Sequence, residues 1–328
     1  MAIALEYRPF EAADLQKLET LWLRDTTWGV ITPRMWQDYV VDAPLGPPAG
    51  VVAIDSATGD IVGQFPFIRA LVQVDGQVHR GFRPAAPILS KRVSSLLQLA
   101  NPFGHPVAEM YTRTMAAIEA EGPGVVYMLP DPRWVRFLKM FTGLQSGKVP
   151  LHSLALPLAE PLALPAGFTV EPITTFGAEV DALWQTASTQ HGAAIVRDAA
   201  ALRWKVGRGD WEVLGVRARG TLVGLAASRQ KGDRQWLVGD VFAADLDEAL
   251  RATLVAVCLL ADRRSREAPA TKPVHKVALA VTPAMAPAVA AVGFVRDAYD
   301  FPLVVQAFGD GCRHDAVAPA RWYVSAND

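Results

Sequence analysis

The chain has 328 residues, of which 51% are hydrophobic and 20% are charged, and its formal net charge is −1. This length and composition fit two folded domains of ordinary size and exclude a largely disordered protein. The near-neutral charge argues against wide, non-specific binding of nucleic acid. The longest apolar run, residues 254–261, is too short to cross a bilayer, and the first residues form no basic, signal-like segment. We therefore expect a cytoplasmic protein with no membrane partner.

The predicted elements follow one another in an order that occurs twice. Residues 6–22 predict a short strand and a helix, and residues 51–68 predict two strands joined by a tight turn. Residues 106–120 predict a helix, and residues 125–144 predict a buried strand, a proline at a helix start and a short helix. Three of these stretches, residues 6–22, 51–68 and 125–144, match residues 168–184, 212–229 and 276–295 of the second half in the same order. Repeats of this length indicate duplicated domains.

The boundary between the two copies falls in the proline-rich residues 149–167. We place an N-terminal domain at residues 1–158 and a C-terminal domain at residues 159–328. Within each copy, a run of antiparallel strands is followed by a strand–helix–strand unit. This order predicts the α/β class, with a mixed sheet covered by helices in each domain.

The order of elements resembles the GNAT acyltransferase fold, and its repetition resembles the tandem, double-domain GNAT group. That group is related in architecture to Fem-type aminoacyltransferases. The resemblance covers nearly the whole chain and is carried by residues 8–22, 104–143, 197–206, 236–250 and 321–328. It implies two tandem GNAT-like domains, each with a mixed, mostly antiparallel sheet flanked by helices. It further implies an N- or O-acyltransferase that uses acetyl-CoA or another acyl-CoA and acts on a small metabolite or sugar intermediate.

The second half departs from the family at the turn that normally holds the cofactor. A glycine-rich turn before the central helix lets backbone N–H groups approach the pyrophosphate, but here the turn reads AADLDEA, residues 243–249. Asp245, Asp247 and Glu248 place negative charge where phosphates would lie, and they complement the helix dipole instead. We therefore expect this half not to bind CoA in the usual manner.

The first half offers a different set of groups for a phosphate. Lys91, Arg92 and Ser94 precede a glycine and His105, which stand directly before the predicted helix at residues 106–120. Two cations and a hydroxyl beside a helix start suit an anion. The alternative is a surface loop with a solvated basic pair.

Three side chains are candidates for catalysis. Tyr127 lies in the strand expected to line the acyl cleft of the first half, and it is either a proton donor or a packing residue. Asp240 is a lone carboxylate in an apolar strand, so it is either functional or buried with partners. Arg203 either pairs with Asp240 or meets an acidic group of the substrate. His191 stands at a helix end before a glycine, as an acceptor-recognition residue or a helix cap. The tyrosine that the family often carries on the helix after its fifth strand is missing from both halves.

Other classes of function stay open at this stage. Loss of the glycine turn and of the helix tyrosines favours a non-catalytic pair of domains that binds a ligand or acts as a scaffold. A Fem-type transferase that uses aminoacyl-tRNA would also lack a CoA turn, although tRNA contact usually requires a basic face. Metal chemistry has no support, since the 6 histidines and 2 cysteines show no ligand spacing. Nothing in the sequence predicts the oligomeric state.

Overall fold

The computed structural model describes most of the chain and divides it into two compact units. The described residues are 4–25, 33–85, 87–96, 104–132, 135, 138, 143–207, 209–232, 234–267 and 274–328. The first unit comprises residues 1–71, 79–128 and 306–313, and the second comprises residues 72–78, 129–305 and 314–328. Three strands, β3 (Ile61–Val74), β4 (Gln77–Pro84) and β14 (Val295–Phe308), each contribute residues to both units.

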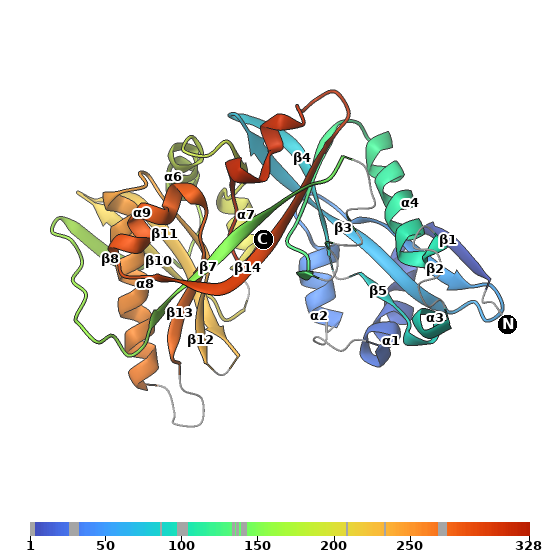
Figure 1. Ribbon diagram of the computed structural model, residues 1–328, viewed down its shortest axis with the longest axis horizontal. Coiled ribbons are helices and arrows are strands. Elements are labelled where there is room, and N and C mark those ends of the chain that lie inside the picture. Colours follow the sequence, from blue (N-terminus) through green and yellow to red (C-terminus); the bar gives the residue numbers. More distant parts are fainter. Residues whose placement is uncertain are drawn as a thin grey trace. The chain divides into compact units, whose positions relative to one another are not determined.

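The first unit is built on a mixed sheet in the order β1–β2–β3–β4–β6 (Figure 1). Its strands are β1 (Leu5–Pro9), β2 (Ala49–Asp55), β3 (Ile61–Val74), β4 (Gln77–Pro84), the short β5 (Ile88–Leu89) and β6 (Gly124–Met128). Its helices are η1 (Ala12–Asp14), α1 (Leu15–Asp25), α2 (Pro33–Trp36), η2 (Gln37–Val41), α3 (Lys91–Leu96) and α4 (Pro106–Ala120). Strands β1, β2 and β3 pair antiparallel, whereas β4 and β6 pair parallel.

The second unit has a larger sheet in the order β8–β10–β11–β12–β13–β7–β14. Its strands are β7 (Gln145–Ala155), β8 (Phe168–Pro172), β9 (Ala193–Ile195), β10 (Glu212–Ala218), β11 (Thr221–Lys231), β12 (Gln235–Ala243), β13 (Lys276–Ala280), β14 (Val295–Phe308) and β15 (Trp322–Tyr323). Its helices are α6 (Ala178–Ser188), α7 (Ala199–Lys205), α8 (Glu248–Glu267), η4 (Pro283–Met285), α9 (Ala286–Ala291), η5 (Asp315–Val317) and η6 (Pro319–Arg321). The pair β12–β13 is parallel, and its neighbours in the sheet are antiparallel.

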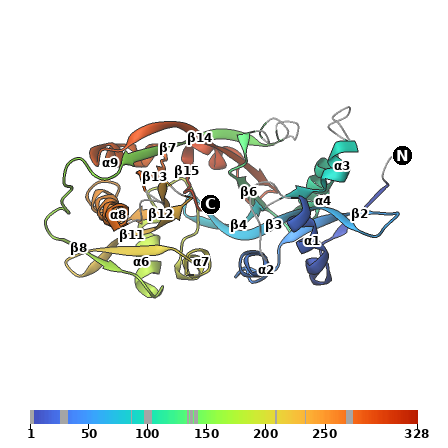
Figure 2. The same ribbon diagram turned by 90° about the horizontal axis from the view of Figure 1, so that it is seen from below.

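Helices cover both faces of the second sheet, with α8 on one face and α6 on the other (Figure 2). The alternation of side chains along the strands explains this arrangement. Gly224 of β11 faces Thr253 of α8, whereas Phe242 of β12 makes an edge contact with Trp184 of α6 at 5.5 Å. Strand β12 is therefore buried on both faces, as its nearly continuous apolar sequence predicts.

The predicted α/β class is confirmed, with a mixed, mostly antiparallel sheet flanked by helices. The order β1–α1–β2–β3–β4–α4–β6 returns as β8–α6–β10–β11–β12–α8–β13, with short elements inserted between them. Strand β7 pairs with β13 and β14. The predicted boundary between an N-terminal domain at residues 1–158 and a C-terminal domain at residues 159–328 stays a prediction. Among the described helices, none is both long and apolar enough to cross a membrane.

The contact between Gly224 and α8 gives a first test of the fold. A Cβ added at Gly224 would lie 1.9 Å from the hydroxyl of Thr253, which donates to the carbonyl of Ala249 at 2.7 Å. Gly224→Ala is expected to destabilise the protein by about 1–3 kcal/mol in urea unfolding, because α8 must move from the sheet. Adding Thr253→Ala should recover part of that loss. The control Gly177→Ser, where a Cβ meets nothing within 4 Å, should be nearly neutral.

Candidate functional site

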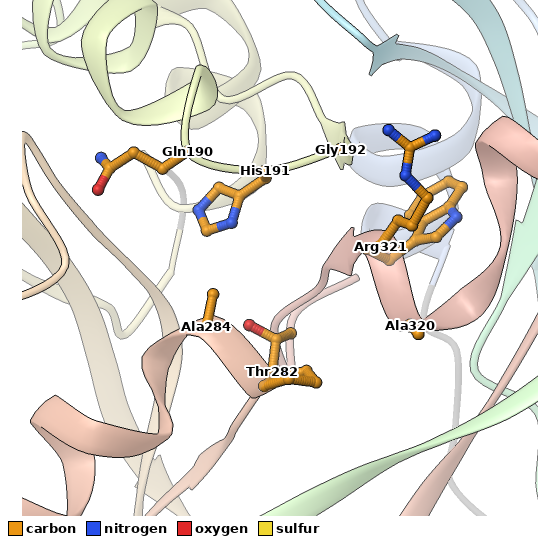
Figure 3. Close-up of a pocket in the computed structure, with 9 residues that line it drawn as sticks. Gln190, His191, Gly192, Thr282, Ala284, Ala320 and Arg321 are labelled. Carbon is orange, nitrogen blue, oxygen red and sulfur yellow. The ribbon is translucent and has the colours of Figure 1, made fainter.

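A pocket of about 250 Å³ lies within the second unit. Three segments line it: the chain between α6 and β9, the chain from β13 into η4, and the chain from η6 into β15. The lining residues are Gln190, His191, Gly192, Thr282, Pro283, Ala284, Ala320, Arg321 and Trp322. Figure 3 shows His191 and Thr282 on opposite sides of the same space, with Ala284 beside them.

Strand pairing brings the first and third of these segments together. Strand β9 pairs parallel with β15, so that Ala194 lies opposite Tyr323. The imidazole of His191 stacks on the ring of Tyr323, with 4.6 Å between the ring centroids and 16° between the planes. A Cβ at Gly192 would lie 2.7 Å from Arg321 Nε, so Arg321 would have to shift to make room for it.

His191 is held in its neutral form. Burial lowers its pKa from 6.5 to about 4, and the nearby positive charge of Arg197 acts in the same direction. Neither imidazole nitrogen has a hydrogen-bond partner among the described residues, and the backbone N–H donates to the carbonyl of Ser188 at 3.2 Å. An unprotonated imidazole at neutral pH can accept a proton or a hydrogen bond from a ligand.

Thr282 provides the second polar group without a partner. The residue is 2% exposed, and its hydroxyl oxygen makes no hydrogen bond within the part of the chain that the structure describes. An unsatisfied buried hydroxyl costs about 1–3 kcal/mol, so the Thr282 hydroxyl would be stabilised by a hydrogen bond to a group in the pocket. It lies just beyond the carboxyl end of β13.

The charged group of the pocket wall is already paired. Arg321 makes a two-pronged ion pair with Asp75, with Nη1 3.2 Å from Oδ2, and also donates to the carbonyl of Ala316 at 3.2 Å. In Figure 3 its guanidinium points away from Thr282. The amide of Gln190 donates to the carbonyl of Ala243 at 2.9 Å. These two residues therefore shape the wall rather than offer free polar groups.

An ionic network whose central groups, Arg197 and Asp240, are fully buried lies behind the pocket. Asp240 on β12 accepts from Arg197 Nε at 2.8 Å, from the Ser325 hydroxyl at 2.8 Å and from the Asn327 amide at 3.1 Å. Arg197 and Asp240 are both 0% exposed. The predicted pairing of Asp240 with Arg203 is wrong, because the guanidinium of Arg203 donates to the carbonyl of Phe176 at 2.6 Å.

A second carboxylate completes the network. Asp328 accepts from Arg197 and, at 2.6 Å, from Lys205 Nζ. Burial alone would raise the pKa of Asp328, but the charges of Arg197 and Lys205 hold that pKa well below its usual range. Two cations thus balance two carboxylates, which is the condition for keeping four charges inside a protein.

Tyr323 connects this network to the pocket. The Tyr323 ring stacks on His191, and it also contacts the guanidinium of Arg197, whose central carbon lies 4.4 Å from the ring centroid. The Tyr323 hydroxyl donates to the carbonyl of Val241 on β12. The structure therefore brings two of the predicted residues, His191 and Asp240, into one assembly, although they do not touch.

The third catalytic candidate lies elsewhere. Tyr127 belongs to β6 in the first unit and is 4% exposed. Like His191 and Asp240, it keeps its proposed catalytic role only as a prediction.

The predicted cofactor-binding residues also lie in the first unit. Arg92 on α3 pairs with the buried carboxylate of Asp55 at 2.6 Å, and Lys91 beside it is exposed. His105 caps α4, accepting from the N–H of Val107 at 3.3 Å, and burial lowers its pKa. The side chain of Ser94 lies outside the described residues. A phosphate-binding role for these four side chains stays a prediction.

Two backbone N–H groups at the start of α8 already bond to a side chain of the protein. Asp245 Oδ1 accepts hydrogen bonds from the N–H groups of Asp247 and Ala249, each at 3.0 Å. These are N–H groups that would otherwise meet an anion. The acidic turn that the sequence places before this helix thus acts as an internal cap.

Comparisons with solved structures show that this fold is similar to that of GCN5-related N-acetyltransferases. A GCN5-related N-acetyltransferase from Anabaena variabilis ATCC 29413 is similar with a TM-score of 0.67 and 11% identity, over 92% of this chain and 72% of that chain. A GCN5-related N-acetyltransferase from Kribbella flavida is similar with a TM-score of 0.63 and 14% identity, over 93% of this chain and 71% of that chain. In sequence, the chain matches no known protein family and no curated protein.

Sequence reasoning missed Thr282, Tyr323 and Arg197. Thr282 follows an apolar strand and precedes a proline, a pattern that also occurs at ordinary helix starts. Arg197 stands beside a polar turn, where an exposed arginine is the usual expectation. Within the described residues, no group of His, Cys, Asp and Glu could hold a metal ion.

The pKa of His191 predicts how stability depends on pH. Because the folded pKa, about 4, lies below 6.5, the unfolded chain binds a proton in this range that the folded protein does not. The free energy of unfolding should therefore fall as pH drops from 6.5 to 4, by up to about 3 kcal/mol from this residue. His191→Gln should remove that part of the pH dependence in urea unfolding. Identical pH dependence in both proteins would contradict the burial of a neutral imidazole.

Proposed function

We propose that the protein is a tandem GNAT-type acyltransferase whose active pocket is the one in the second unit. The donor is acetyl-CoA or another acyl-CoA, and the acceptor is an amine or hydroxyl of a small metabolite or sugar intermediate. The fold and the repeated order of elements support the class. The observation that carries the site is the pairing of a neutral imidazole, His191, with an unsatisfied hydroxyl, Thr282, at one pocket.

These two groups fit the chemistry of acyl transfer. The acceptor loses a proton as it attacks the thioester carbonyl, and the carbonyl oxygen gains negative charge. The imidazole of His191 is in the form that takes a proton, and the hydroxyl of Thr282 is available to donate to the oxygen. As the carbon–sulfur bond breaks, His191 passes the proton directly on to the departing thiolate.

The phosphates of the donor need a place other than the start of α8, where Asp245 takes the helix N–H groups. The pocket itself accommodates an acyl group and a small acceptor rather than a whole CoA. Lys91, Arg92, Ser94 and His105 belong to the first unit and form a separate candidate phosphate site. Their role is tested together with the donor.

A second candidate function is ligand binding without catalysis. The hydrogen bonds of Asp245 at the start of α8 favour this function, because a domain without a phosphate site there can still hold a small molecule in its pocket. The predicted Fem-type use of aminoacyl-tRNA is a further possibility, and a donor test distinguishes it from both.

The thermal stability of the purified protein, measured with and without millimolar acetyl-CoA or free CoA, tests whether the donor is an acyl-CoA. A ligand at about 100 times its dissociation constant should add roughly 2.7 kcal/mol of stability. We expect a clear shift for both, and a reduced shift in Lys91→Ala/Arg92→Ala relative to the same variant without ligand. Absence of a shift with either compound would reject the CoA-dependent enzyme and leave ligand binding or an aminoacyl-tRNA donor.

A further inference from the structure

The polar groups of the second-unit pocket bear on the kind of acceptor it takes. Its lining residues include no aspartate or glutamate. The guanidinium of Arg321 is matched by Asp75, and the amide of Gln190 is matched by backbone carbonyls. The lining side-chain groups left for a ligand are therefore the uncharged imidazole of His191 and the uncharged hydroxyl of Thr282.

A hydroxyl group complements these two partners. A neutral imidazole offers one donor and one acceptor, and a threonine hydroxyl both donates and accepts. An alcohol can donate to the imidazole nitrogen and accept from Thr282 at the same time, which satisfies the buried hydroxyl. An ammonium group only donates, so it would leave the proton of Thr282 unmatched.

The charges around the pocket, like its hydrogen-bonding groups, favour an uncharged acceptor over a protonated amine. A protonated amine entering the pocket finds no lining carboxylate to balance it. The guanidinium of Arg197 lies over the Tyr323 ring on which His191 stacks, and its charge disfavours a cation at the imidazole. An ammonium ion would meet the same unfavourable field and would lose its hydration as well.

We propose that the acceptor at this pocket is an uncharged hydroxyl compound, of the alcohol or sugar class, so that the transfer forms an ester rather than an amide. The proposal rests on the acyltransferase function above for its transfer step. In that step the hydroxyl oxygen bonds to the acyl carbon, its proton passes to His191, and the carbon–sulfur bond breaks. His191 passes this proton directly on to the departing thiolate, without being held as an imidazolium, so that the products are an ester and free CoA.

Matched pairs of compounds that differ in one group test the preference. Benzyl alcohol with benzylamine, cyclohexanol with cyclohexylamine, and inositol with its monoamino analogue serve as probes. Each is titrated while the ring-proton NMR signal of His191, assigned from the spectrum of His191→Gln, is followed. We expect at least one alcohol to shift this signal with an affinity about tenfold or more above that of its amine, and Thr282→Val to remove most of that advantage. Amines that bind as well as alcohols, or a signal that no alcohol moves, would overturn the proposal.

The transfer step is read separately from binding. Acetyl-CoA is added to each pair, released thiol is measured, and the product is treated with alkaline hydroxylamine, which cleaves esters and leaves amides intact. A hydroxylamine-sensitive product supports the proposal, and an amide overturns it while the acyltransferase function stands. Alcohol binding without thiol release would instead reject the acyltransferase function and keep the preference of the pocket.

Discussion

Replacing Arg197 by methionine should destabilise the protein by about 3–5 kcal/mol, the range expected when one partner of a buried ion pair is removed. Arg197 is 0% exposed and is held by Asp240 at 2.8 Å, by Asp328 and by the carbonyl of Ile195 at 2.7 Å. Methionine is also apolar and fills much of the same space. The loss would therefore come from two buried carboxylates left with Lys205 as their remaining cation.

A surface arginine in the same unit is the matched control. Arg264 on α8 pairs with Glu212 at 2.8 Å, but its side chain is 43% exposed. Water screens such a pair, so Arg264→Met should change the free energy of unfolding by no more than about 1 kcal/mol. Urea unfolding of the two variants at neutral pH makes the comparison. Equal, small losses would contradict the burial of the ion pair between Arg197 and Asp240.

The second large effect is expected on catalysis. Glutamine in place of His191 keeps a polar side chain but cannot accept a proton at neutral pH. A positioned general base contributes typically about 10²–10⁴-fold to the rate, so His191→Gln should lower kcat/KM by a factor in that range. The loss should fall mainly on kcat, because the proton moves only as the reaction proceeds.

His275→Gln is the control for this variant. His275 is exposed and precedes β13 in the same unit. Steady-state thiol release from acetyl-CoA should be unchanged in this control, and urea unfolding at neutral pH should show both variants folded. A His191→Gln protein with the kcat/KM of the wild type would remove His191 from the mechanism.

Much of the fold follows from local patterns in the sequence. Alternating and continuous apolar stretches predict the strands, and the acidic turn before residue 248 predicts the start of α8. The duplication of these patterns gives the order of elements in both halves. Pairing between distant segments is different, because nothing in the residues of β9 or β15 indicates that they lie side by side.

The site was only partly predictable for the same reason. Asp240 stands out because a carboxylate in an apolar strand needs a partner, but two nearby arginines could supply it. Asp198 caps α7 by accepting from the N–H of Ala201 at 2.8 Å, and this cap fixes the helix phase. Arg203 then lies on the last turn and Arg197 lies before the helix, beside β12. Which arginine lies near Asp240 therefore depends on the tertiary fold rather than on spacing along the chain.

The most direct test of the central claim is acyl transfer by a variant in which the pocket is filled. Ala284 lines the pocket and is exposed, so tryptophan should fit there without disturbing the core. Ala286, two positions further on, is exposed and does not line it. We predict that Ala284→Trp abolishes thiol release from acetyl-CoA with the acceptors that the wild type uses, whereas Ala286→Trp retains it. Full turnover by Ala284→Trp would show that the reaction takes place somewhere other than this pocket.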